Sequence, residues 1–184
     1  MKIFTFRYTP IFFILSSVFI LTSCSNDDDP EDIHGEEEIN RVVLQITSDA
    51  GTETYTWNET GTSNTAIQLA ANSTYQVAVA FYDASDASDV ENITEEVIEE
   101  ADEHQVFYGK VGIASNLTIA SRTGDTLDSN DNPVLINTQW TTAEASTGTV
   151  RVYLIHEPTS KTGESRDDFG GEIDVEVDFS IEIE

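Results

Sequence analysis

The last twelve residues of this 184-residue chain alternate strictly between apolar and polar side chains. A period of two puts successive side chains on opposite faces of an extended strand. A helix would spread the same apolar residues around its whole circumference, so the segment predicts a strand with one buried and one acidic face. The apolar set is Ile173, Val175, Val177, Phe179, Ile181 and Ile183.

The same period recurs through residues 39–184, which we expect to form one domain. Turn residues such as Gly, Asn and Asp separate the alternating segments. Eight or nine short strands at this spacing predict a mainly β fold, an antiparallel β-sandwich of immunoglobulin-like type. The further predicted strands are 42–47, 54–57, 66–69, 75–82, 106–111, 116–121, 134–141 and 149–155.

One segment breaks the period and predicts a short helix over residues 93–103. Asn92 is a favourable N-cap residue, and the apolar residues that follow are spaced as on one face of a helix. This set is Ile93, Val97, Ile98 and Ala101, with glutamates between them.

The first 23 residues predict a bacterial lipoprotein signal peptide. Lys2 and Arg7 precede an apolar run, Ile11–Leu21, which has the length of a signal sequence and is too short to span a bilayer. The motif Leu-Thr-Ser-Cys that ends at Cys24 matches a lipobox, so we expect Cys24 to be lipidated and to anchor the mature chain to the outer membrane. Ordinary secretion with a chance cysteine is the alternative.

Residues 24–38 predict a solvated tether, because acids dominate them and almost no apolar residue is available for a core. The run Asp27–Asp29 after Cys24 resembles the export signal of Bacteroidetes lipoproteins that reach the cell surface. A spacer that faces the periplasm is the alternative. The mature chain would hold 6 basic and 35 acidic residues, a formal charge of −29.

Charge and composition exclude several function classes. A net charge of −27 repels nucleic acid and anionic lipid headgroups, so we expect neither as a direct partner. A single Cys rules out internal disulfides and a Cys-rich zinc site. No nucleotide-binding, zinc-protease, nucleophile-elbow or dithiol motif occurs, and we therefore expect a protein that is not an enzyme.

Two histidines of the folded part suggest a metal site. His104 directly precedes one predicted strand and His156 ends another, while Glu172 opens the last strand. If these strands pair antiparallel, both imidazoles and the carboxylates of Glu103, Glu157 and Glu172 meet at one end of the sandwich. Imidazole and carboxylate suit zinc, copper or iron. Isolated surface histidines are the alternative.

Residues 128–133 place Asp and Asn at alternate positions, as calcium loops do. The Gly and Glu that complete an EF-hand loop are absent, and the same residues are common in turns. A turn is the favoured interpretation.

Several strings carry a resemblance to a known family: Glu99–Tyr108 (EEADEHQVFY), His156–Pro158 (HEP) and Gly170–Val177 (GGEIDVEV), beside the lipobox and the acidic tether. The chain resembles a family of flavobacterial (Bacteroidetes) surface lipoproteins, some of them labelled "type 1 periplasmic-binding fold". That label would require alternating strands and helices over roughly twice this length, whereas the periodicity here is β.

Relatives in this family are often encoded beside TonB-dependent receptors. The resemblance therefore implies an accessory protein that captures a metal, a metal complex or haem for such a receptor. The alternative is an immunoglobulin-like adhesion or cell-surface assembly module without a metal site. It predicts an exposed aromatic or apolar patch around Trp57 or Trp140.

Overall fold

A computed structural model describes residues 38–61 and 65–184. The predicted signal peptide, Cys24 and nearly all of the predicted tether therefore lie outside the described residues.

The described residues form nine strands, one α-helix and one short 3-10 helix, so the mainly β prediction is confirmed. Every predicted strand is present within a few residues of its expected bounds. The elements, in chain order, are β1 (Arg41–Ser48), β2 (Gly51–Asn58), β3 (Ile67–Leu69), β4 (Thr74–Tyr82), α1 (Ile93–Glu99), β5 (His104–Val111), β6 (Leu117–Ser121), β7 (Asn137–Thr142), β8 (Ser146–His156), η1 (Arg166–Asp168) and β9 (Glu172–Ile183).

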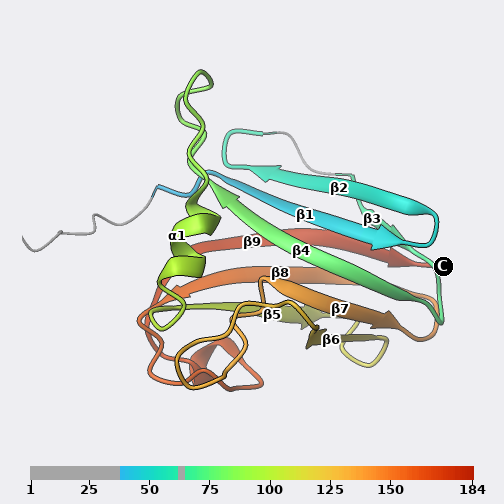
Figure 1. Ribbon diagram of the computed structural model, residues 1–184. Helices are drawn as coiled ribbons and strands as arrows, with labels where there is room; N and C mark the ends of the chain where they lie inside the picture. The colour runs from blue at the N-terminus through green and yellow to red at the C-terminus, as the bar shows by residue number, and fades with distance from the viewer. Residues whose placement is uncertain (1–37, 62–64) are drawn as a thin grey trace, which may run out of the picture. The chain divides into compact units, whose positions relative to one another are not determined.

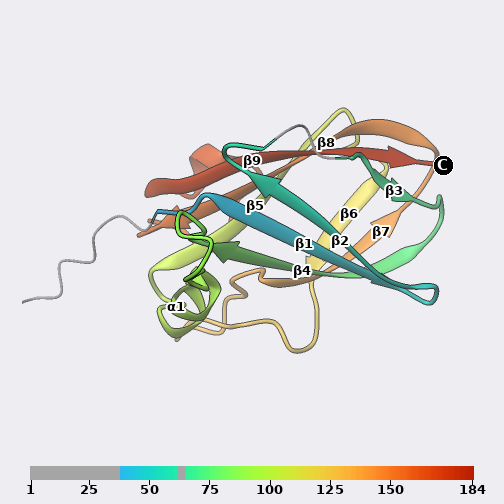
Figure 2. The same ribbon diagram turned by 90° about the horizontal axis from the view of Figure 1, so that it is seen from above.

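Two sheets lie face to face, and Figure 2 shows them as separate layers. One has the order β2-β1-β4-β7-β6 and the other the order β3-β9-β8-β5. Taken in chain order, β4-β7-β6 match strands B, E and D of an immunoglobulin domain, and β9-β8-β5 match G, F and C. β1 takes the place of strand A beside β4, and β2 adds an edge strand. The expected β-sandwich is confirmed. It departs from the antiparallel prediction at one place, since β3 pairs with β9 in parallel and the four-stranded sheet is therefore mixed.

The core fills the space between the sheets, because the inward residues of each strand are apolar. Trp140, Phe81, Phe179 and Leu44 are among its largest side chains and are 0–1% exposed. Trp140 lies edge-on against Tyr108, with ring centroids 5.9 Å apart, and its Nε1 donates to Thr138 Oγ1 at 3.0 Å. Trp140 is therefore a core residue. Trp57 is partly buried and packs against the same core.

Helix α1 closes one end of the sandwich, on the left in Figure 1. Ile93 and Val97 join the core, and Thr94 Oγ1 both accepts from Phe81 N and donates to Phe81 O on β4. The helix ends at Glu99, earlier than the predicted residue 103. Ala101 is buried as its apolar position requires, while Ile98 is 42% exposed.

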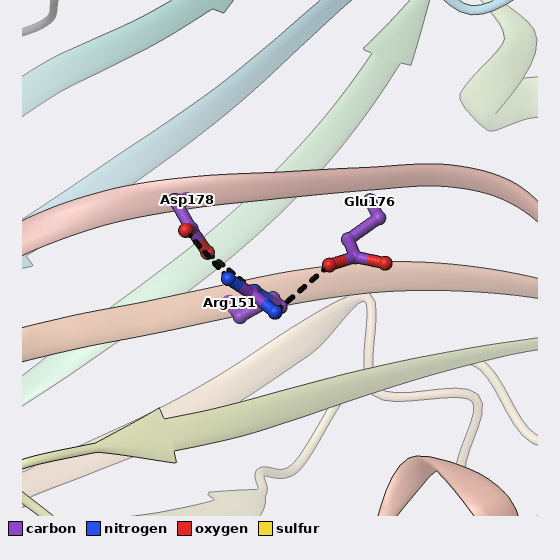
Figure 3. A network of polar contacts seen from close by, with 3 residues as sticks. All are labelled: Arg151, Glu176 and Asp178. Atoms are coloured by element: carbon purple, nitrogen blue, oxygen red, sulfur yellow. Dashed lines mark hydrogen bonds and ion pairs between the residues drawn. The ribbon is translucent and has the colours of Figure 1, made fainter.

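The outward faces of the two sheets differ in charge. On the four-stranded sheet, Arg151 of β8 forms ion pairs with Glu176 and Asp178 of β9, at 2.9 and 2.6 Å (Figure 3). The outward positions of the described five-stranded sheet hold mainly Thr, Gln and Ala and no acid, although the chain carries 35 acids. Representative residues are Gln45, Thr54, Gln76, Ala78, Gln139 and Thr141.

No helix in residues 38–61 and 65–184 combines the length and apolarity needed to cross a bilayer.

Candidate metal centre

Three strand ends meet at the end of the sandwich that α1 covers (Figure 1). β5 begins there with His104, β8 ends there with His156, and β9 begins there with Glu172. The strands are antiparallel, and His104 is the direct cross-strand partner of His156, which in turn pairs with Glu172. The predicted convergence of these three residues at one end is therefore present.

The two imidazole rings stack on each other. Their centroids are 4.9 Å apart and their planes differ by 13°. His104 lies on the inward side of β5, as Val106 and Tyr108 do, and is only 2% exposed. His156 is partly open to solvent, with 30% of its side chain exposed. One histidine of the pair is therefore in the core and the other is at the surface.

A β-bulge brings Asp174 into the same site. Leu154 of β8 pairs with Val175, but the next residue, Ile155, pairs with Ile173, so Asp174 has no opposite residue of its own. A bulge of this kind re-aims the side chain at the extra position. The side chain of Asp174 is only 11% exposed, and its Oδ1 lies 3.8 Å from Nδ1 of His156.

The bulge also corrects the sequence prediction for Ile173. Strict alternation put Ile173 on the apolar face of the strand and Asp174 on the solvated face. In the structure Ile173 is 44% exposed, while Val175 and the apolar residues after it stay in the core. A shift of one residue exchanges the two faces of a strand. Ile173 is therefore exposed and Asp174 largely buried, the reverse of the predicted arrangement.

His104, His156 and Asp174 together could hold a metal ion, since one ligand atom from each lies within 4.8 Å of those of the other two. Ligand atoms around tetrahedral zinc lie roughly 3.4 Å apart, given bonds of about 2.0–2.1 Å. Binding therefore requires the triangle to contract by about an ångström and the stacked His156 ring to turn, because an imidazole lone pair lies in the plane of its ring. The His156 side chain, which is 30% exposed, has room for both movements. Three protein ligands leave a fourth position open for water or another ligand.

The backbone selects the nitrogen with which His104 would bind a metal. His104 Nδ1 lies 3.2 Å from the carbonyl oxygen of Glu100, at the end of α1. A carbonyl only accepts hydrogen bonds, so Nδ1 carries the proton and Nε2 holds the free lone pair. This is the arrangement usual for metal-bound histidine, whose other ring nitrogen donates to a backbone or carboxylate oxygen.

Burial keeps His104 in the neutral form that binds metals. Desolvation is the main cause that lowers the pKa of His104 below its ordinary value of 6.5. The neighbouring His156 and the Lys161 ammonium lower the pKa further, whereas the bond to Glu100 and the charge of Glu103 act in the opposite direction.

The three glutamates that the sequence predicted as metal ligands lie around the cluster, but none belongs to the group of residues whose ligand atoms meet there. Glu103, Glu157 and Glu172 are all exposed. Their main chains shape the site instead: Glu157 N donates to Glu103 O at 2.7 Å, which ties the end of β8 to the start of β5. Asp174, which sequence reasoning missed, lies in an unbroken alternation, so no local pattern marks the bulge.

The predicted turn at residues 128–133 has its carboxylate occupied by the loop itself. Asp128 Oδ1 accepts from the backbone N–H groups of Asn130 and Asn132, both at 2.8 Å, and Oδ2 accepts from Asn132 Nδ2. These bonds lower the pKa of Asp128. Hydrogen bonds of this pattern are typical of a turn that begins with an aspartate.

Comparisons of the chain with known protein families, with curated proteins and with solved structures find no match. The resemblance to flavobacterial surface lipoproteins stays a prediction from the residues quoted above.

Proposed function

We propose that this protein is a surface lipoprotein of the outer membrane that binds a divalent metal ion, or a small metal complex, and passes it to a TonB-dependent receptor. The observation that carries the proposal is the meeting of His104, His156 and Asp174 at one end of the sandwich. Two imidazoles and a carboxylate form a donor set that suits zinc, copper and iron.

The geometry favours binding and release over permanent structural use of the ion. Structural zinc sites are closed by four protein ligands, whereas this cluster supplies three and leaves one position open. One side is buried through His104 and the other is partly exposed through His156. An incoming ligand reaches the ion from the His156 side.

The strong negative charge supports capture from dilute solution. A field of one sign raises the local concentration of the opposite ion and speeds its association. The exposed Glu103, Glu157 and Glu172 surround the cluster and supply that field locally. We propose that these glutamates attract the metal ion, and that His104, His156 and Asp174 coordinate it.

Calorimetric titration of residues 36–184 with Zn²⁺, Cu²⁺ and Fe²⁺ tests metal binding. This fragment contains every described strand and the core, and it leaves out His34. We expect one-to-one binding with a Kd of about 1 μM or lower, a free energy near −8 kcal/mol. The His104→Ala/His156→Ala double variant should lose it. Weak binding at several sites, unchanged in the double variant, would overturn the proposal.

Anchoring needs its own experiment in the full chain. With Cys24 intact we expect the protein in the outer-membrane fraction and accessible to protease on whole cells. Cys24→Ser should release it into the soluble fraction. A Cys24→Ser protein that stays in the membrane would rule out the lipid anchor, whatever the metal result.

A second candidate function is adhesion or surface assembly, and the outward face of the five-stranded sheet, whose described positions hold no acid, favours it. This face can approach an acidic partner surface with less repulsion than the rest of so acidic a chain exerts. The triple variant Gln45→Glu/Gln76→Glu/Gln139→Glu should abolish cell attachment and leave metal binding intact. Unchanged attachment would exclude this face as the contact.

A further inference from the structure

A groove runs along the open side of the sandwich, where β5 and β6 are the edge strands of their sheets. The loop between β8 and β9 roofs it through residues 161–164 and Phe169. The groove measures about 630 Å³, within the range of small-molecule sites. None of His104, His156 and Asp174 lines it, although its residue Lys161 contacts the backbone of His104.

Apolar side chains form the floor and walls of the groove. Phe107 of β5 packs against Phe169 of the roof, with ring centroids 5.0 Å apart, and stacks on Tyr153 at 5.8 Å. Ile119 and Leu135 are only partly buried and face the same groove. These residues offer a bound molecule an apolar and aromatic surface of the kind that lines ligand pockets.

Leu135 is held in a strained conformation at this groove. Its φ of 70° lies in the left-handed region, which a branched residue rarely adopts. Its backbone is fixed from both sides, since Asp125 Oδ2 accepts from Leu135 N and Tyr108 Oη donates to Leu135 O, both at 3.1 Å. Strain of this kind persists only where the surroundings enforce it, and it is concentrated at ligand sites.

Both lysines of the described ranges line the groove. Lys110 Nζ donates to the Leu117 carbonyl at 3.2 Å, across the gap between the two sheets. Lys161 Nζ donates to the carbonyls of Ala101 and His104. An ammonium has three donors, so two remain on Lys110 and one on Lys161.

Neither lysine forms an ion pair with a carboxylate in residues 38–61 and 65–184. The chain has 35 acids available, and Arg151 on the neighbouring sheet surface does pair with two of them. Lys161 lies within the electrostatic influence of Asp128 and Asp102, which leaves Lys110 as the ammonium group that can take an anionic partner. An ammonium group of this kind, at one end of an apolar groove, is complementary to an anion with an apolar body.

We infer that this groove binds a small amphipathic anion, an aromatic or aliphatic carboxylate or sulfonate. Its apolar part would lie on Phe107 and Leu135, and its anionic group would accept from Lys110 at one end of the groove. Charge-assisted hydrogen bonds of this kind are about twice as strong as neutral ones, so Lys110 selects an anion over a neutral molecule of equal shape.

Fluorescence titration with a matched pair of probes tests the inference. The anionic probe is 8-anilinonaphthalene-1-sulfonate, and N-phenyl-1-naphthylamine is its uncharged counterpart. Residues 36–184 should bind one anionic probe with a Kd on the order of 10 μM. Lys110→Gln should weaken that binding at least about fivefold and leave the neutral probe unchanged. Lys110→Arg should restore it.

Arg41→Gln serves as the matched control, because it removes one positive charge from β1, three strands away from β6 in the five-stranded sheet, and should change neither titration. Amide NMR shifts on adding the anionic probe should concentrate at Gly109, Ala114 and Thr162–Glu164. The inference is overturned if the wild-type fragment does not bind the anionic probe, if Lys110→Gln and Arg41→Gln bind it equally well, or if the shifts fall elsewhere. Lys110 is exposed, so near-ultraviolet circular dichroism should show each variant folded as the wild type.

Discussion

Oδ1 of Asp174 lies 3.8 Å from Nδ1 of His156, although the two residues are not opposite each other in the β8–β9 ladder. The extra residue in β9 produces this contact. Without the bulge, Asp174 would point to the outward face, and the stacked histidines would have no buried carboxylate beside them. The proposed metal centre therefore depends on one irregularity in an otherwise regular sheet.

Asp174→Asn should weaken zinc binding by at least about tenfold, or roughly 1.4 kcal/mol, because it keeps the shape of the side chain and removes the anionic ligand. Glu176→Gln is the matched control, two residues along the same strand on the outward face. Calorimetry on both variants checks the prediction. Equal losses would mean that general charge, and not coordination, holds the ion.

Stability should fall as the pH is lowered through the region just below 6.5. The pKa of His104 is lowered in the folded protein, so the unfolded chain takes up a proton first and is favoured as the pH drops. The limiting slope is about 1.4 kcal/mol per pH unit. Urea unfolding at several pH values should show this slope in the wild type and a flatter one in His104→Gln. Identical slopes would contradict the burial argument.

Gly171→Ala should disturb the bulge and the site together. Gly171 has a φ of 64°, and an added Cβ would overlap the carbonyl oxygen of His156. Gly124→Ala is the control, because its φ of 88° is also left-handed but its Cβ would meet nothing closer than 4.0 Å. The control should cost about 1–2 kcal/mol for the backbone alone. Gly171→Ala should cost more and should also weaken metal binding, which thermal melts and calorimetry would show.

The fold could be predicted from the sequence because most strands keep a strict period of two over apolar residues that a sandwich core needs. The pairing of His104 with His156 could be predicted too, since antiparallel neighbours bring the start of one strand to the end of the other. These inferences use only local pattern and sheet geometry.

The bulge and the groove could not be predicted in the same way. Asp174 sits in an alternation that continues unbroken on both sides, and only the Gly170–Gly171 turn and the ladder with β8 show where the register shifts. The helix ends at Glu99 and not at residue 103, since the carbonyl of Glu100 instead accepts from Glu103 N and lies beside the ring of His104. Both differences arise from tertiary contacts.

Trp140→Ala should cost about 3–5 kcal/mol, the usual range for a buried aromatic residue, and the loss of the ring would leave a cavity beside Tyr108. Trp57→Ala should cost less, because Trp57 is only partly buried. Denaturant unfolding compares the two. A larger effect at Trp57 would show that the core is centred elsewhere.

Arg151→Gln should raise the pKa of Asp178, whose carboxylate accepts two hydrogen bonds from the guanidinium in Figure 3. Those bonds are the main cause that lowers this pKa below 3.8, so their stabilising effect is lost as the pH falls through that region. NMR titration of the Asp178 carboxyl carbon measures the change. Metal binding should stay as in the wild type, since Arg151 is on the outward face.

Anomalous X-ray diffraction at the zinc edge, from crystals equilibrated with one equivalent of Zn²⁺, tests the metal centre most directly. The account predicts a single strong peak about 2.0–2.1 Å from His104 Nε2, a ring nitrogen of His156 and a carboxylate oxygen of Asp174. No peak at this cluster, or a peak held only by exposed glutamates, would contradict it.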